Sequence, residues 1–184
     1  MIDIHKITGR MGNLMFQWSF LYALCREGQI PDTYVQDFKY FDKYRNELRE
    51  IFHEGITSVP YVGIHCRRGD YAGNTFHSDM SKTDYYERAM ALFPGANFKV
   101  FSDDIQWCRG QERFKGCEFS TNTTELEDFN ELASCMDGII IANSSFSFWT
   151  AYLSNAKKIV MPKENTWFRD GVERVTCPPE WIRV

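Results

Sequence analysis

The chain reads YVGIHCRRGD from residue 61 to residue 70. A short apolar run that follows Pro60 and stops at polar residues is typical of a buried strand, which delivers its last residues to the edge of a sheet. This run ends in two adjacent arginines, Arg67 and Arg68. Guanidinium groups match phosphate oxygens in geometry as well as in charge, so the stretch predicts a clamp for a diphosphate. The alternative interpretation is a structural cluster of ion pairs between the arginines, Asp70 and other acids.

Strand and helix patterns alternate on both sides of this stretch. Apolar runs predict strands at residues 2–7, 61–66, 98–102, 117–120, 138–142 and 158–161, the last closed by Pro162. Apolar residues spaced by three and four predict helices at residues 14–25, 41–52, 83–93, 126–135 and 145–153, with a short helix after Asp103. Ser81 and Asp84 have the spacing of a capping box at the start of one of them. Strict alternation requires a mostly parallel sheet covered by helices on both faces, so we predict an α/β, Rossmann-like fold.

Composition narrows the class of protein. The chain has 184 residues, of which 43% are hydrophobic, enough for one sizeable core and one domain with at most a small appendage. The net charge of −4 argues against a general nucleic-acid binder, which is normally basic. The sequence has no leader pattern and no apolar run of membrane-spanning length, and its six cysteines form no zinc or Cys-x-x-Cys motif. We therefore expect a reduced, cytoplasmic protein without a membrane span or a nucleic-acid partner.

Polar motifs follow three of the predicted strands. In open parallel sheets, ligands bind beyond the carboxyl ends of the strands. Residues 67–70 follow one strand, residues 103–104 the next, and residues 143–146 the strand at 138–142. Residues 143–146 also open a helix, whose free backbone N–H groups can hold a phosphate, although a plain serine cap is the alternative. We expect the two aspartates at 103–104 to match a helix dipole, a structural role.

Three further positions have open interpretations. Asp128 begins a predicted helix and either caps it or accepts two hydrogen bonds from the N–H groups of a guanine. His65 lies inside a strand, where a satisfied core histidine is the simple interpretation. As a group that could accept a proton, Asp70 is nearest to the arginines in the sequence, but it could instead orient Arg68. His77 and Asp79 lie in the polar loop that follows, and none of these residues can be assigned as the base.

Several segments match one family. The segments are residues 9–17 (GRMGNLMFQ), 65–71 (HCRRGDY), 101–104 (FSDD), 143–149 (NSSFSFW), 158–162 (KIVMP) and 167–168 (WF). In this order they resemble the α1,2-fucosyltransferases, within the inverting fucosyltransferases that share a His-x-Arg-Arg-type signature. The resemblance covers most of residues 1–28 and nearly all of residues 37–170.

The resemblance implies a fold and a reaction. The expected fold is of the GT-B type, with two facing nucleotide-binding domains. The expected reaction transfers fucose from GDP-fucose to a sugar hydroxyl, α1,2 on a galactoside, with inversion and without a metal or other cofactor. Arg67 would hold the diphosphate with Arg68 as its helper, and Asp70 completes the candidate catalytic set. The substrate-binding residues would be Arg10, Gly12, Asn13, His65, Asp128, Ser144, Ser145 and Phe146, with Asp128 reading guanine and the two serines on the phosphate side.

The chain also departs from this family. Only eleven residues separate Gly28 from Tyr40, where family members carry a long segment. We therefore expect residues 1–58 to form a reduced amino-terminal, acceptor-side domain and residues 59–184 a nucleotide-sugar-binding domain. The alternative function is a module that binds GDP or a GDP-sugar without transferring it. A homo-oligomer could replace the missing surface, with Trp18, Phe20 and residues 34–44 as an adhesive face.

Overall fold

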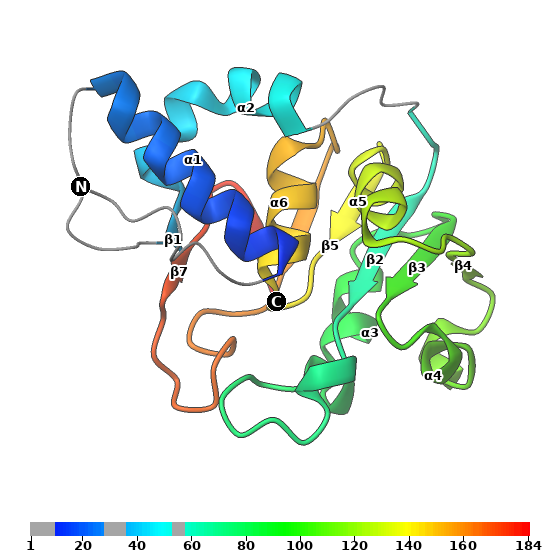
Figure 1. Ribbon diagram of the computed structural model, residues 1–184. Helices are drawn as coiled ribbons and strands as arrows, with labels where there is room; N and C mark the ends of the chain where they lie inside the picture. Colours follow the sequence, from blue (N-terminus) through cyan, green and yellow to red (C-terminus); the bar gives the residue numbers. More distant parts are fainter. Residues whose placement is uncertain (1–9, 28–35, 53–57) are drawn as a thin grey trace.

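The core of the protein is a six-stranded parallel sheet (Figure 1). The computed structural model describes residues 10–27, 36–52 and 58–184, so the strand expected at residues 2–7 lies outside the described residues. The strands of the sheet are β2 (Val62–Cys66), β3 (Phe98–Ser102), β4 (Glu118–Phe119), β5 (Gly138–Ile140), β6 (Ile159–Met161) and β8 (Ile182–Arg183). Their spatial order is β4-β3-β2-β5-β6-β8, and every pairing is parallel. The Rossmann-like α/β fold predicted from the sequence is confirmed.

The strand order places β2 at the centre of the sheet. From β2 the chain moves outward through β3 to β4, and it then returns to the other side of β2 as β5. Such a reversal is the topological switch point of a doubly wound sheet, and ligands bind in the crevice outside the carboxyl ends of the two strands that flank it. All five residues of β2 are buried, as expected for a central parallel strand. The site should therefore lie just beyond Cys66 and Ile140.

Helices cover both faces of the sheet. On one face lie α5 (Glu125–Ala133) and α6 (Ser145–Leu153), and on the other α3 (Tyr85–Met90) and α4 (Ile105–Arg109). Side chains of a strand alternate between the faces. Ile139 and Ile141 accordingly pack in the core cluster that contains α5 and α6, whereas Ile140 packs with α3 and α4. Short 3₁₀ turns complete the chain at Phe38–Tyr40, Asp42–Tyr44, Gly69–Tyr71, Met80–Lys82 and Glu112–Phe114.

The amino-terminal segment packs against α6. Helices α1 (Met11–Glu27) and α2 (Arg45–Phe52) lie beside α6 in Figure 1, and Phe16 and Phe41 pack on Trp149 in one cluster. A second, two-stranded parallel sheet joins β1 (Gln36–Asp37) to β7 (Val175–Thr176). Residues before and after position 58 thus share a core. The division into two domains at that position stays a prediction.

Four details differ from the sequence predictions. The segment at 41–52 begins with a 3₁₀ turn, so its α-helix starts only at Arg45. The sheet does not end at Pro162, because β8 adds a strand beside β6. Ser81 and Asp84 form no capping box: Ser81 lies in a 3₁₀ turn, and Asp84 makes no side-chain cap. The proposed adhesive face is also reduced, because Phe20, Phe38 and Phe41 are buried.

Candidate active site

Arg67 lies buried at the switch point, between two carboxylates. Its side chain is only 8% exposed. The Nη2 atom lies 2.7 Å from Asp70 Oδ1, and the Nη1 atom lies 3.0 Å from Asp103 Oδ2. The guanidinium carbon lies 5.5 Å from the centre of the Tyr71 ring. Two acids and an aromatic ring therefore fix the orientation of this cation, as a buried charge requires.

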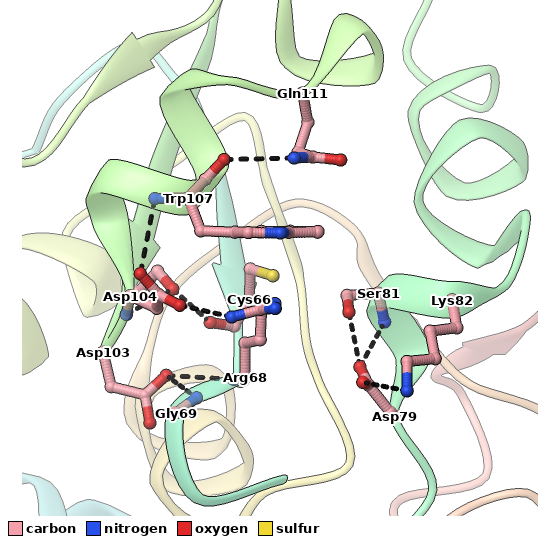
Figure 2. Close-up of polar contacts among 11 residues, drawn as sticks. Cys66, Arg68, Gly69, Asp79, Ser81, Lys82, Asp103, Asp104, Trp107 and Gln111 are labelled. Carbon is pink, nitrogen blue, oxygen red and sulfur yellow. Dashed lines mark hydrogen bonds and ion pairs between the residues drawn. The ribbon is translucent and has the colours of Figure 1, made fainter. Parts of the chain in front are cut away.

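Arg68 points away from Arg67. Figure 2 shows its side chain extended toward Asp104, with which it forms an ion pair, and beside Trp107, over whose ring the guanidinium lies at 4.3 Å. Different acids hold the two side chains, since Arg67 pairs with Asp70 and Asp103 whereas Arg68 pairs with Asp104. The two guanidiniums therefore do not share one clamp, and both form the ion pairs of the alternative interpretation. The part that each arginine has in a reaction stays a prediction. Asp70 likewise contacts Arg67 and not Arg68.

The two acids after β3 have different surroundings. Asp104 caps α4, because its side chain accepts a hydrogen bond from the backbone N–H of Trp107, which confirms its expected structural role. Asp103 instead accepts hydrogen bonds from the backbone N–H groups of Arg68 and Gly69 and pairs with Arg67. It thus holds the turn after β2 and its arginine in place.

The amino terminus of α6 lies at the same edge of the sheet. Ser144 is the N-cap residue, yet its side chain makes no capping hydrogen bond, so the plain serine cap is the wrong interpretation. The first N–H groups of a helix have no acceptor within the helix, and they carry partial positive charge. Ser144, Ser145 and Phe146 line the same cavity as Arg67. An anion in this cavity would meet a guanidinium and a helix start together.

The start of α1 closes directly over α6. Gly12 approaches so closely that a Cβ atom on it would lie 2.5 Å from the backbone nitrogen of Phe146. The Ser145 Oγ donates a hydrogen bond to Asn13 Oδ1 at 2.9 Å. Arg10 lies 3.9 Å from Asp70. The structure therefore brings the three predicted amino-terminal residues to the arginine site.

Two adjoining cavities surround this centre. The larger has a volume of about 480 Å³ and the smaller of about 230 Å³. Both are lined by Arg10, Arg67, Phe146 and Glu125, which form the boundary between them. Sequence reasoning missed Glu125, although an acid in the first turn of a helix that starts at this edge of the sheet was a signal. Arg68 is not among the residues that line either cavity.

Asp128 lines the smaller cavity. Its Oδ1 atom accepts hydrogen bonds from Ser120 Oγ at 2.5 Å and from Asn122 Nδ2 at 3.1 Å. The cap of α5 is formed by Thr124 with Glu127, so Asp128 is not the capping residue. Burial is the largest influence on the Asp128 carboxyl and raises its pKa above the ordinary value. Two uncharged donors, the Ser120 hydroxyl and the Asn122 amide, therefore hold the carboxylate at the cavity. They do not neutralise its charge, so the carboxylate can also accept hydrogen bonds from the N–H groups of a ligand.

His65 is buried at the end of β2. Burial lowers the pKa of its imidazole to about 3, so the ring is neutral near pH 7. The ring lies 4.9 Å from that of Phe146, and its Nδ1 atom has no hydrogen-bond partner among the residues that the structure describes. The interpretation as a satisfied core histidine is therefore wrong. His65 also lines the smaller cavity.

The two other base candidates have different positions. His77 lines the larger cavity. Asp79 is buried and bonded to Ser81 and Lys82, away from Arg68 in Figure 2, and it does not line either cavity. Of the two base candidates in this loop, His77 therefore lies at the site and Asp79 does not.

The structure describes residues 10–27, 36–52 and 58–184. No group of three or more His, Cys, Asp or Glu side chains in these ranges could hold a metal ion. Within the same ranges no helix has the length and apolar character to cross a membrane. The five cysteines whose side chains are described, Cys66, Cys108, Cys117, Cys135 and Cys177, are free thiols.

Comparison with known proteins agrees with the motifs. Residues 29–184 match the model of a protein family described as glycosyl transferase family 11. An α-1,2-colitosyltransferase of Escherichia coli is 32% identical over 81% of this chain and 60% of its own length. A galactoside α-(1,2)-fucosyltransferase 2 of Bos taurus is 27% identical over 91% of this chain and 52% of its own length.

Among solved structures, the β-Kdo 2,7-transferase KpsC of Thermosulfurimonas dismutans has a TM-score of 0.42 at 13% identity, over 77% of this chain and 48% of that chain. That likeness is too low to support an argument, so the fold assignment rests on the sheet itself. The chain spans between half and two thirds of the length of the curated relatives named above. The family match covers most of the sequence, and the chain therefore belongs to glycosyl transferase family 11.

Proposed function

We propose that this chain binds GDP-fucose across the two adjoining cavities and transfers the fucosyl group to a galactoside, α1,2 and with inversion. The single observation that carries the proposal is the meeting of Arg67 with the amino terminus of α6 at the switch point, where both line one cavity. Guanidinium groups and helix starts both favour phosphate oxygens. The names of the two relatives support the transfer of a deoxy sugar with α-1,2 linkage.

The nucleotide would extend from the larger cavity into the smaller one. With the diphosphate at Arg67, Ser144 and Ser145, the smaller cavity receives the guanosine. Asp128 would accept hydrogen bonds from the ring N–H and the amino group of guanine. Arg10, Gly12 and Asn13 would close over the donor from the start of α1.

The bond changes of the proposed reaction are few. The bond between the fucose carbon and the β-phosphate oxygen breaks, and its electron pair leaves with GDP. The acceptor oxygen forms its bond on the opposite face of that carbon and releases its proton, so the configuration inverts. Arg67 and the helix start neutralise the charge that develops on the leaving phosphate, usually the largest catalytic contribution. This chemistry is proposed to need no metal ion.

Titration of GDP by calorimetry tests the clamp. The loss of one charge-assisted contact weakens binding by about ten- to a hundredfold, and we expect this loss for Arg67→Ala. Arg67→Lys separates an effect on binding from an effect on folding. It keeps the positive charge that pairs with the two acids, but lysine lacks the planar fork that bonds two oxygens at once, so we expect a folded variant that binds GDP more weakly. Arg68→Ala is the matched control, since Arg68 pairs with Asp104 outside both cavities. Equal GDP affinity in the parent and in Arg67→Ala contradicts the clamp.

Turnover tests the reaction. We expect GDP to be released from GDP-fucose faster in the presence of methyl β-galactoside than in its absence. Release that does not depend on the acceptor would identify a hydrolase. GDP binding without release would support the alternative function, a nucleotide-sugar-binding module. That alternative stands because the chain spans only part of the length of its relatives.

Self-association and a cytoplasmic location remain part of the proposal. The free thiols of the described cysteines are in keeping with a reducing compartment.

Trp18 is 39% exposed and Tyr40 45% exposed, so part of the expected adhesive face remains at the surface. Gel filtration of the purified chain tests the homo-oligomer, which a monomer with full activity contradicts.

A further inference from the structure

Four of the aromatic rings that line the larger cavity contact one another, and Asp128 does not line this cavity. They are Tyr71, Phe76, His77 and Phe168, here called the aromatic wall. Tyr71 stacks on His77 at 4.4 Å, and the rings of Phe76 and Phe168 lie 5.0 and 5.3 Å from that of His77. Phe76 and Phe168 are themselves 4.9 Å apart. The proposed positions of the diphosphate and the guanine make no use of this wall.

Hydrogen bonds join the two loops that carry the aromatic wall. The backbone N–H of Arg169 donates to the carbonyl of Phe76 at 2.9 Å, and that of Ser78 donates to the carbonyl of Trp167 at 3.1 Å. The buried amide of Asn143 donates to the carbonyls of Ser78 and Trp167, at 2.9 and 2.8 Å. Two loops far apart in the sequence are thus fastened together by one side chain from the end of β5. A surface fixed in this way loses little entropy when it binds a ligand.

The outer part of the wall is open. Phe76 is 46% exposed, whereas Tyr71 and Phe168 are largely buried. The guanidinium of Arg174 lies over Phe76 at 5.1 Å and over Phe168 at 4.9 Å, and Asp170 holds it with two hydrogen bonds. An open apolar ring beside fixed N–H donors suits a ligand that is apolar on one face and rich in hydroxyls at its edge.

A galactoside has this character. Its axial hydroxyl leaves several C–H groups together on one face of the ring, and the electron-rich face of an aromatic side chain attracts such groups. We propose that the aromatic wall binds the acceptor sugar by stacking its open ring, Phe76, against the apolar face of that sugar. The proposal deepens the function proposed above and rests on it.

Position favours the acceptor over the donor. The fucosyl group must remain next to the β-phosphate, hence next to Arg67 and the start of α6. From Arg67 the contacts lead outward through Tyr71 and His77 to Phe76. The guanine would occupy the other cavity, where Asp128 lies. The aromatic wall therefore lies on the side of the fucosyl group that is away from the guanine, where the acceptor sugar must bind.

Titration with methyl β-galactoside in the presence of GDP tests the wall without requiring turnover. Saturation-transfer NMR on the full chain reports the sugar protons that contact the protein. We expect Phe76→Ala to weaken sugar binding about two- to tenfold, the usual range for one aromatic pair, while GDP affinity stays within twofold of the parent. Phe76→Tyr should restore binding because it keeps the ring. Ile182→Ala is the control, since Ile182 is another exposed apolar side chain (39%) and lies outside both cavities.

The outcomes separate this proposal from the function on which it rests. Sugar binding that is lost in Phe76→Ala supports the wall even if the parent shows no transfer, a result that would contradict the proposed function instead. A parent that binds GDP but not methyl β-galactoside overturns the wall. So does a Phe76→Ala variant whose sugar affinity equals that of the parent, or one in which the affinity for GDP-fucose falls while that for the galactoside does not.

Discussion

The Nη1 atom of Arg67 lies 3.0 Å from the Oδ2 atom of Asp103, and this contact joins the end of β2 to the end of β3. Burial is the largest influence on the Asp103 carboxyl and by itself raises its pKa. The backbone N–H of Arg68, the charge of Arg67 and the backbone N–H of Gly69 together outweigh burial, so the pKa lies below its ordinary value. A carboxyl with a lowered pKa stabilises the fold above its unfolded pKa of about 4, and this stabilisation is lost as the pH falls through the folded value.

We therefore expect Asp103→Asn to lower the free energy of unfolding by about 1–3 kcal/mol at pH 7, because it removes a charge-assisted contact. The difference from the parent should shrink as the pH falls below about 4. Urea denaturation at several pH values measures both effects. Asp84→Asn is the control, since the pair of Asp84 with Arg88 is exposed and contributes little. A difference that stays constant with pH would show that the charge of Asp103 is not the cause.

Gly12→Ala should separate the start of α1 from α6. The added Cβ would lie 2.5 Å from backbone atoms of Ser145 and Phe146, which cannot rotate away. We expect a loss of about 1–3 kcal/mol in the free energy of unfolding, typical of an overpacked contact. The hydrogen bond from Ser145 to Asn13 should weaken with it. Thermal denaturation measures the loss.

Gly110→Ala provides the matched control for that variant. The nearest backbone atom to its new Cβ, the carbonyl oxygen of Trp107, lies at 3.4 Å, so this alanine should fit. If both variants melt at the temperature of the parent, α1 does not depend on the close approach at Gly12. If both lose stability equally, the loss reflects glycine replacement in general and not the contact with α6.

The centre of the fold could be predicted because buried parallel strands leave continuous apolar runs. The apolar runs at β2, β5 and β6, whose residues are all buried, predict their strands for this reason. The edge strand β8 is only two residues long and leaves no period to detect. The true capping box, Thr124 with Glu127, and the false one, Ser81 with Asp84, have the same spacing, so spacing alone could not separate them.

The sequence predicts those site residues whose positions follow from the topology of the sheet. It does not predict those whose positions depend on side-chain direction or on the packing of loops. Parallel strands end at one edge, which brought Arg67 and Ser144 together as expected. The direction of Arg68 depends on the turn after β2 and on its ion pair with Asp104, which a motif of two adjacent arginines does not reveal. The aromatic wall joins two irregular loops through Asn143, and loop residues carry no periodic signal.

Asp128→Asn should improve stability and impair nucleotide recognition. Burial raises the pKa of the Asp128 carboxyl, so its charge destabilises the folded chain at pH 7, and this cost disappears once the pH falls below the unfolded value of about 4. We expect the variant to be at least as stable as the parent at pH 7. It should bind GDP more weakly and lose the preference for GDP over inosine diphosphate, which lacks the amino group. Calorimetric titration with both nucleotides measures the preference, and a variant that keeps it shows that Asp128 does not read the base.

His65 should remain neutral in the folded protein down to low pH. Burial has the largest effect on its imidazole and lowers the pKa to about 3, and the charges of Arg67 and Arg10 act in the same direction, while that of Asp103 acts against them. The unfolded chain, with a histidine pKa of about 6.5, therefore binds more protons than the folded chain between about pH 6.5 and 3. Stability must then fall as the pH decreases through this window.

At pH 5 the expected contribution of this histidine is a loss of about 2 kcal/mol relative to pH 7, because one pKa unit corresponds to about 1.4 kcal/mol. His65→Gln removes the titrating group, so its free energy of unfolding should change less between pH 7 and 5 than that of the parent. NMR of the imidazole protons gives the direct measurement, and a ring that titrates near pH 6.5 in the folded chain would contradict the assignment. Because the ring stays neutral, GDP affinity between pH 5 and 8 should carry no contribution from His65, and a pH dependence there must come from other groups of the site, such as His77.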